Sequence, residues 1–134
     1  MYKRQELGKA TGALWAIVPH PAVALKHGSP RQIDEYLRPS CAMERRACVA
    51  VTEAGAGSDP RMIGARADHR DGRFVLNGEK WFVTSGDVAD YIILHANVGG
   101  DPEKPTLFLV DKATPGVRIA RKPKFTHTYV FRCV

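Results

Sequence analysis

Two kinds of hydrophobic pattern divide the chain near Arg46. Before this point, Glu6 to Val18 is rich in Leu, Ala and other helix-compatible residues, and apolar residues recur at helical spacing after Ser29. After it, short apolar runs alternate with turn residues, as is typical of β-structure. The pattern therefore predicts a helical segment in residues 1–45 and a β-rich part in residues 46–134.

The second helix carries clear signals at both ends. Ser29 precedes Pro30, a residue favoured at the first helical position, and Gln32 follows three positions after Ser29, so we expect a capping box. One short apolar face follows at helical spacing, formed by Ile33, Tyr36 and Leu37. Pro39 is expected to end this helix.

The β-rich part shows about seven short strand candidates. They are residues 47–52, 63–69, 73–77, 79–84, 90–98, 106–110 and 116–120. Asp71-Gly72 and Asn77-Gly78 are strong hairpin signals, and Pro115-Gly116 indicates a further turn. The pattern predicts an α+β fold in which a short helical segment precedes an antiparallel barrel or sandwich. The strand-like segment 126–134 ends the chain abruptly, so we expect a barrel that is truncated at its C-terminal end.

Composition narrows the class of protein. The chain has 134 residues, 44% of them hydrophobic and 25% charged, which is typical of a soluble globular domain. Its net charge of +6 suits an anionic partner. Three cysteines without metal-ligand spacing predict a reducing compartment and no metal site. Pro19-His20-Pro21 interrupts the apolar stretch 14–25, which argues against a signal peptide or membrane-spanning helix.

The segment 51–60, VTEAGAGSDP, is unusually small and polar for a loop that follows a strand. Its glycines would let backbone N–H groups approach an anion or a flat ligand closely. A dinucleotide fingerprint is excluded because Pro60 replaces the third glycine and no helix is expected after it. The motifs of a P-loop and of a nucleophile elbow are absent. An ordinary tight loop remains the alternative to a ligand site.

Two ordered blocks resemble the acyl-CoA dehydrogenase family. Six residues match its V-T-E-P-x-A-G-S-D block, namely Val51, Thr52, Glu53, Gly57, Ser58 and Asp59. Seven match its L-N-G-x-K-x-W-I-T-N…A-D block, namely Leu76, Asn77, Gly78, Lys80, Thr84, Ala89 and Asp90. Departures from the usual residues are Ala54, Phe82, Val83 and Ser85. Segments 27–39 and 114–125 also look like this family, so the resemblance covers nearly the whole chain.

The resemblance implies that the chain binds FAD. The implied cofactor residues are Val49, Ala50, Val51, Thr52, Gly57, Ser58, Phe82, Val83 and Thr84. Thr52 would bond to the pyrimidine side of the flavin, Phe82 would offer a flat apolar wall, and Thr84 would lie near N5. Ser58 would also contact the acyl-CoA substrate; alternatively, its hydroxyl only caps a turn. Trp81 and Val83 alternate with Phe82 and Thr84, so one of these two faces could belong to the core.

The implied reaction is the flavin-dependent α,β-dehydrogenation of acyl-CoA thioesters, as in fatty acid β-oxidation. The family's catalytic base belongs to a C-terminal domain, so we expect no catalytic residue here and an inactive isolated chain. Glu53 matches a position that is not this base, and we expect it to accept hydrogen bonds from loop N–H groups. By the same resemblance, residues 1–45 would be a remnant of the N-terminal helical domain and residues 46–134 the middle β-barrel domain.

The implied partners are an acyl-CoA, an electron-transferring flavoprotein and further copies of the chain in a homo-oligomer. We expect neither nucleic-acid binding nor membrane insertion. The implied location is the cytoplasm, or the mitochondrial matrix in a eukaryote, although no transit peptide is seen. Two alternatives stay open. One is a non-catalytic truncated remnant. The other is a small basic β-barrel that binds nucleic acid, although most aromatic residues of the β-rich part fit a core pattern.

Overall fold

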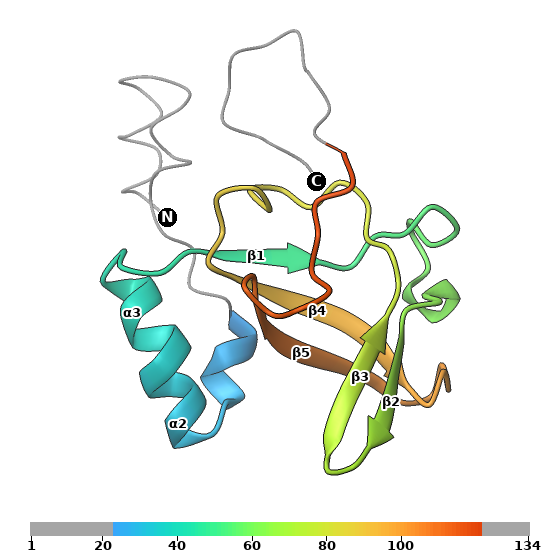
Figure 1. Ribbon diagram of the computed structural model, residues 1–134, viewed down its shortest axis with the longest axis horizontal. Helices are drawn as coiled ribbons and strands as arrows, with labels where there is room; N and C mark the ends of the chain where they lie inside the picture. Colours follow the sequence, from blue (N-terminus) through green and yellow to red (C-terminus); the bar gives the residue numbers. More distant parts are fainter. Residues whose placement is uncertain (1–22, 122–134) are drawn as a thin grey trace, which may run out of the picture. The chain divides into compact units, whose positions relative to one another are not determined.

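The computed structural model describes residues 23–121, which form two compact units, 23–47 and 48–121 (Figure 1). The first unit is helical and the second is built on a five-stranded sheet. The α+β class expected from the sequence is therefore confirmed. The helix expected over Glu6 to Val18 and the strand expected over residues 126–134 lie outside the described residues.

The helical unit begins with the short 3-10 helix η2 (Val23–His27). A continuous helical run follows, made of α2 (Pro30–Gln32), the π-helical η3 (Ile33–Leu37) and α3 (Arg38–Cys41). The capping box is confirmed: the Gln32 N–H donates to Ser29 Oγ at 3.3 Å, and the Ser29 N–H donates to Gln32 Oε1 at 2.9 Å. These two bonds satisfy N–H groups that the first turn of a helix leaves without partners.

The prediction that Pro39 ends the helix is wrong. Pro39 lies in the first turn of α3, and the helix continues to Cys41. Proline has no N–H to donate to the Glu35 carbonyl four residues earlier. The Arg45 guanidinium supplies a donor to that carbonyl at 3.1 Å, and the preceding turns widen to the π form. A bond from outside the helix thus helps the proline to be accommodated.

The sheet unit contains β1 (Ala47–Ala50), β2 (Arg66–Arg70), β3 (Arg73–Asn77), β4 (Tyr91–Val98) and β5 (Pro105–Asp111). The strand order is β1-β4-β2-β3, and β5 pairs with β4. Both hairpins, β2–β3 and β4–β5, are antiparallel, as expected. The pairing of β2 with the end of β4 is parallel, so the sheet as a whole is mixed. β4 is thus the strand that links the two hairpins (Figure 1).

Two of the seven expected strands do not form within the described residues. Residues 79–83 and 117–121 run as irregular backbone between or after the strands. The turn at Pro115-Gly116 is present: Gly116 has φ +94°, and the Val117 N–H donates to the Thr114 carbonyl at 3.1 Å. The turn is therefore confirmed, but the strand expected over residues 116–120 is not observed.

The two hairpin signals have different outcomes. Asp71 and Gly72 have φ of +49° and +74° and join β2 to β3 with Arg70 opposite Arg73, so the first hairpin is confirmed. The hairpin expected at Asn77-Gly78 is wrong, because β3 ends there and the chain continues without a strand on the other side. A Cβ on Gly78 would lie 2.7 Å from the Cβ of Ala65. This glycine therefore permits a close approach of two segments rather than a turn.

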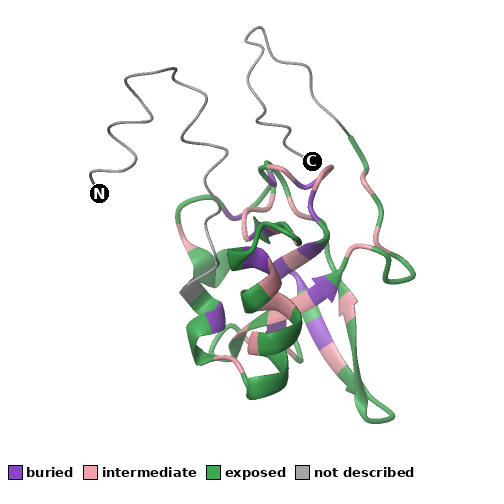
Figure 2. Ribbon diagram, turned by 90° about the vertical axis from the view of Figure 1, so that its left-hand side faces the viewer, coloured by how far each residue is buried: buried purple, intermediate pink, exposed green. Residues whose placement is uncertain are grey.

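Small residues dominate the core of the sheet unit. Figure 2 shows where the buried positions lie along the ribbon. One cluster consists of Ala56, Ile63, Ala65, Ala67 and Ala96. A second consists of Cys48, Ala50, Val83 and Ala89. Asn97 is also buried, and its side-chain amide donates to the Ile63 carbonyl at 2.8 Å, so a buried polar group is satisfied. Within residues 23–121, every helix falls short of the length and apolarity that a membrane crossing requires.

Candidate functional site

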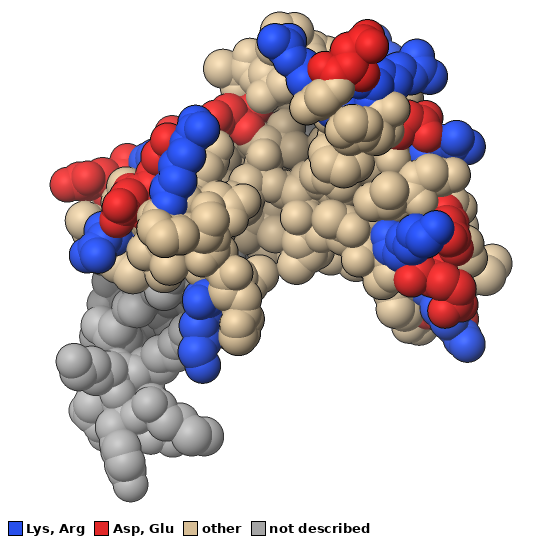
Figure 3. Space-filling model, turned by 90° about the horizontal axis from the view of Figure 1, so that it is seen from below, with Lys and Arg blue, Asp and Glu red and all other residues tan. Residues whose placement is uncertain are grey.

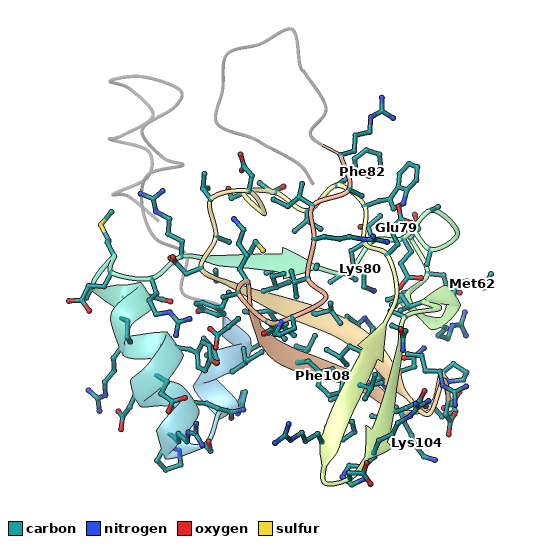
Figure 4. All side chains as sticks on the ribbon, in the orientation of Figure 1. Met62, Glu79, Lys80, Phe82, Lys104 and Phe108 are labelled. Carbon is teal, nitrogen blue, oxygen red and sulfur yellow. The ribbon has the colours of Figure 1, made fainter. Side chains whose placement is uncertain are left out.

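The two sequence blocks that suggested a ligand site lie side by side in the structure. The Trp81 N–H donates to the Thr52 carbonyl at 2.8 Å. The Lys80 ammonium donates to the Val51 carbonyl at 2.9 Å. Figure 4 shows Lys80 inside the fold and Phe82 at its rim. The chain therefore brings segment 51–53 and segment 80–82 together without a regular strand ladder between them.

Glu53 and Lys80 form a buried ion pair at this junction. Their side chains are 13% and 7% exposed, and Lys80 Nζ lies 2.7 Å from Glu53 Oε1. Glu53 also accepts the N–H of Gly64 at 2.7 Å and the N–H of Ala65 at 2.9 Å. The expectation that Glu53 accepts loop N–H bonds is therefore confirmed.

Two opposing effects set the proton affinity of Glu53. Burial alone would raise the pKa of its carboxyl group, because it disfavours the charged form. The bonds from Lys80, Gly64 and Ala65 outweigh burial, so the pKa of Glu53 lies below its ordinary value. The carboxylate is thus held ionised, which suits a structural anchor better than a proton acceptor.

The glycine-containing loop is closed on one side and open on the other. Glu53 and Ala56 exchange two backbone hydrogen bonds of 3.1 Å each, and Ala56 is buried. Gly57 and Ser58 are exposed, and a Cβ at Gly55 or Gly57 would meet nothing within 4 Å. These glycines are not needed for packing inside the chain. They leave backbone accessible to a ligand.

Asp59 ends this loop and starts the 3-10 helix η4 (Pro60–Met62). Its carboxylate accepts the backbone N–H of Arg61 at 3.0 Å and two donors of the Arg61 guanidinium, Nε at 3.0 Å and Nη2 at 2.9 Å. These bonds lower the pKa of Asp59. Asp59 is thus committed to fixing the loop's exit.

Phe82 adopts an uncommon backbone conformation. Its φ is +54°, a region that aromatic residues rarely occupy, and its side chain is 64% exposed. Trp81 is 42% exposed, and the two rings meet edge to face at 5.9 Å. The strand expected over residues 79–84 is therefore wrong, because this backbone departs from the extended form at Phe82. The structure instead presents a flat apolar ring at the surface.

The predicted cofactor residues divide into exposed and buried ones. Val49 is 54% exposed on β1, and Phe82, Thr84, Gly57 and Ser58 are exposed as well. Thr52 and Val51 are half-buried. Ala50 and Val83 point into the second core cluster. These last two could meet a ligand only through their backbone.

Sequence reasoning did not single out His95 or the role of Lys80. His95 lies on β4 opposite Leu107 of β5. Burial lowers the pKa of His95, the charge of Lys80 lowers it further, and the charge of Glu53 opposes both effects. The available signal for Lys80 was a cation within an otherwise aromatic and β-branched segment, KWFVT. No local pattern indicated His95.

Comparison with known proteins identifies the protein family of this chain. Residues 48–129 match the family model of the acyl-CoA dehydrogenase middle domain. The chain belongs to the acyl-CoA dehydrogenase family. Benzylmalonyl-CoA dehydrogenase of Aromatoleum aromaticum is 36% identical over 95 residues, which cover 71% of this chain and 25% of that protein. The chain thus spans about a quarter of this curated relative.

Solved structures of this acyl-CoA dehydrogenase family share the fold. A Mycobacterium smegmatis protein assigned to the acyl-CoA dehydrogenases matches with a TM-score of 0.75 and 36% identity over 87% of this chain and 31% of its own. Glutaryl-CoA dehydrogenase of the same organism, in complex with FADH2, matches with a TM-score of 0.74 and 27% identity over 84% of this chain and 30% of its own. The fold found here is therefore shared with a relative that was solved in complex with FADH2.

Proposed function

We propose that this chain provides the FAD- and acyl-CoA-binding surface of an acyl-CoA dehydrogenase. The observation that carries the proposal is the exposed Phe82 ring beside segment 51–53, next to a glycine-containing loop with open backbone. Family membership and the FADH2 complex of a relative support it. We further propose that residues 1–45 belong to the helical domain and residues 46–134 to the middle domain.

The exposed groups fit the chemistry of a flavin. Phe82 and Val49 offer apolar surface to a flat ring, and the hydroxyls of Thr52 and Thr84 can donate or accept hydrogen bonds at its polar edge. The open backbone at Gly57 suits an anionic group such as a diphosphate. Bound FAD would supply the hydride acceptor. The residues of this chain would bind it and orient it.

The substrate role rests on the same loop. Ser58 is exposed beside Gly57 and Asp59, where its hydroxyl could bond to the CoA portion of a thioester. The reaction is the removal of a proton and a hydride from neighbouring carbons of the acyl group. Lys80, Gly64 and Ala65 occupy the oxygens of Glu53. We therefore propose that another part of the enzyme provides the base and that the isolated chain does not oxidise acyl-CoA.

The proposed partners follow from family membership. An acyl-CoA would be the substrate, an electron-transferring flavoprotein would accept the electrons, and copies of the chain would associate in the parent enzyme. By their names, one relative acts on benzylmalonyl-CoA and another on glutaryl-CoA, so the family accepts different acyl groups. We propose a CoA thioester as the substrate, as in fatty acid β-oxidation.

Titration of the purified chain with FAD, followed by quenching of flavin fluorescence, tests the proposal. We expect saturable binding. Thr84→Ala should weaken it about five- to tenfold, the cost of one hydrogen bond. Gly57→Val should weaken it by at least as much, because it fills the open space at the loop. Thr114→Ala, which removes an exposed hydroxyl from a turn elsewhere, is the matched control and should leave the affinity unchanged. A chain that is folded by circular dichroism yet quenches no flavin would contradict the proposal.

A further inference from the structure

The Glu53–Lys80 ion pair includes the residue that immediately precedes the exposed Trp81 and Phe82 of the proposed site. We propose that this pair is a positioning device, which holds Trp81 and Phe82 against segment 51–53 in the backbone conformation that exposes the Phe82 ring. The inference rests on the ligand-binding role proposed above for Phe82. It assigns a role to Glu53 and Lys80 that is distinct from contact with a ligand.

The contacts show how one ion pair joins three segments. The Lys80 ammonium donates both to the Val51 carbonyl and to Glu53 Oε1. The Glu53 carboxylate in turn accepts N–H groups from Gly64 and Ala65. Segments 51–53 and 64–65 are therefore tied to the residue immediately before Trp81. A displacement of Lys80 would break its bonds to Val51 and Glu53 and would leave Glu53 bonded only to Gly64 and Ala65.

Segment 79–83 needs such a tie because it lacks a strand ladder. Its backbone is held at Trp81 by the bond to the Thr52 carbonyl. The next residue after Phe82, Val83, has a buried side chain. Phe82 itself has φ +54°. A left-handed conformation at an aromatic residue is unfavourable and persists only where neighbouring contacts hold it. Lys80 and Trp81 supply those contacts on one side and Val83 on the other.

Burial makes the pair sensitive to the loss of either partner. Both side chains are largely withdrawn from solvent. Removing one charge leaves the other buried and uncompensated, whereas replacing both with neutral groups removes that penalty. A double-mutant cycle should therefore show strong coupling between positions 53 and 80. If the pair positions the aromatic segment, this coupling should also appear in how firmly the Trp81 side chain is held.

The experiment follows Trp81 directly. The chain has two tryptophans, Trp15 and Trp81, so Trp15→Phe leaves Trp81 as the only fluorescent indole. In this background, Lys80→Met should raise the acrylamide quenching constant of Trp81 and reduce the near-ultraviolet circular dichroism of its contact with Phe82. FAD affinity should fall about tenfold, within the range of couplings between contacting residues. Lys80→Met combined with Glu53→Gln should recover part of both signals.

Lys104→Met is the matched control. It removes a lysine from an exposed ion pair with Asp101, 3.0 Å long, far from the aromatic segment in Figure 4. It should leave Trp81 quenching and FAD affinity unchanged. Should Lys80→Met fail to fold, Glu53→Gln alone keeps an amide acceptor at position 53 and should still raise Trp81 quenching.

Two outcomes would overturn the inference. One is a folded Lys80→Met chain with a lower free energy of unfolding but unchanged Trp81 quenching, which would make the pair a stabilising contact only. The other is a Glu53→Gln chain that is folded and has an unchanged Trp81 signal. If the Trp15→Phe chain binds no FAD, the proposed function fails, while the quenching measurement still decides the positioning role.

Discussion

His95 lies within reach of the charges of Lys80 and Glu53, so its protonation is coupled to the candidate site. Burial and Lys80 lower its pKa in the folded chain, and Glu53 only partly opposes them. The unfolded chain therefore binds a proton more readily than the folded chain. The resulting stability is fully present above the ordinary pKa of about 6.5 and is lost as the pH falls through the lowered pKa.

His95→Gln should weaken the dependence of the free energy of unfolding on pH that His95 causes. We expect the free energy of unfolding of the wild-type chain, measured in urea, to fall as the pH is lowered from about 7.5 to about 5. The His95→Gln chain should fall less steeply over the same interval. His69→Gln is the control, because His69 is exposed on β2 and packs edge to face on Phe74. Equal slopes for wild type and His95→Gln would refute the coupling.

At the scale of the secondary-structure elements, the close approach of Gly78 to Ala65 constrains which residue can stand at position 78. Gly78→Ala would place a Cβ 2.7 Å from the Ala65 Cβ and 2.9 Å from its Cα. Neither atom can rotate away, so we expect a loss of about 1–3 kcal/mol in the free energy of unfolding. Gly55→Ala meets nothing within 4 Å and should change stability by less than about 0.5 kcal/mol. Comparable denaturation midpoints for the two variants would contradict this reading of Gly78.

Two Asx-Gly pairs, at residues 71–72 and 77–78, show which elements local sequence can predict. Asp71-Gly72 and Asn77-Gly78 carry equivalent hairpin signals, yet only the first makes a turn. The first lies between two segments that pair with each other, so local chemistry decides. At Gly78 the deciding contact comes from Ala65, which no local pattern reveals. Pro39 is a second such case, because the Glu35 carbonyl, which the proline cannot bond, accepts a donor from Arg45 beyond the helix.

In the candidate site, too, some features follow from the sequence and others depend on contacts between distant segments. The two motif blocks, the exposure of Phe82 and the bonding of Glu53 follow from features visible in the sequence and its family resemblance. The positive φ of Phe82 does not, since FVT is an ordinary strand pattern. The tie from Lys80 to Val51 and the burial of His95 depend on segments that meet only after folding.

For the molecule as a whole, the question is whether the net charge of +6 marks a nucleic-acid surface. Many of the described cations are paired with acids at the surface. The pairs are Arg31–Glu35, Arg38–Asp34, Arg61–Asp59, Arg66–Asp68 and Lys104–Asp101. Basic and acidic side chains lie next to one another on the face drawn in Figure 3. Such mixing gives a weak attraction for polyanions rather than a continuous basic track.

The salt dependence of binding distinguishes a flavin-binding function from a nucleic-acid-binding function. A fluorescently labelled single-stranded oligonucleotide should bind the chain weakly at about 50 mM salt and lose that binding by about 200 mM, because the attraction comes from released counterions alone. FAD carries only one diphosphate, and the apolar surface of Phe82 should contribute to its binding, so its affinity should change far less over this interval. Phe82→Ala should weaken FAD binding and leave the oligonucleotide signal unchanged. Saturable oligonucleotide binding that survives at about 200 mM salt and is lost in Phe82→Ala would instead favour base stacking on this ring, and with it a nucleic-acid function.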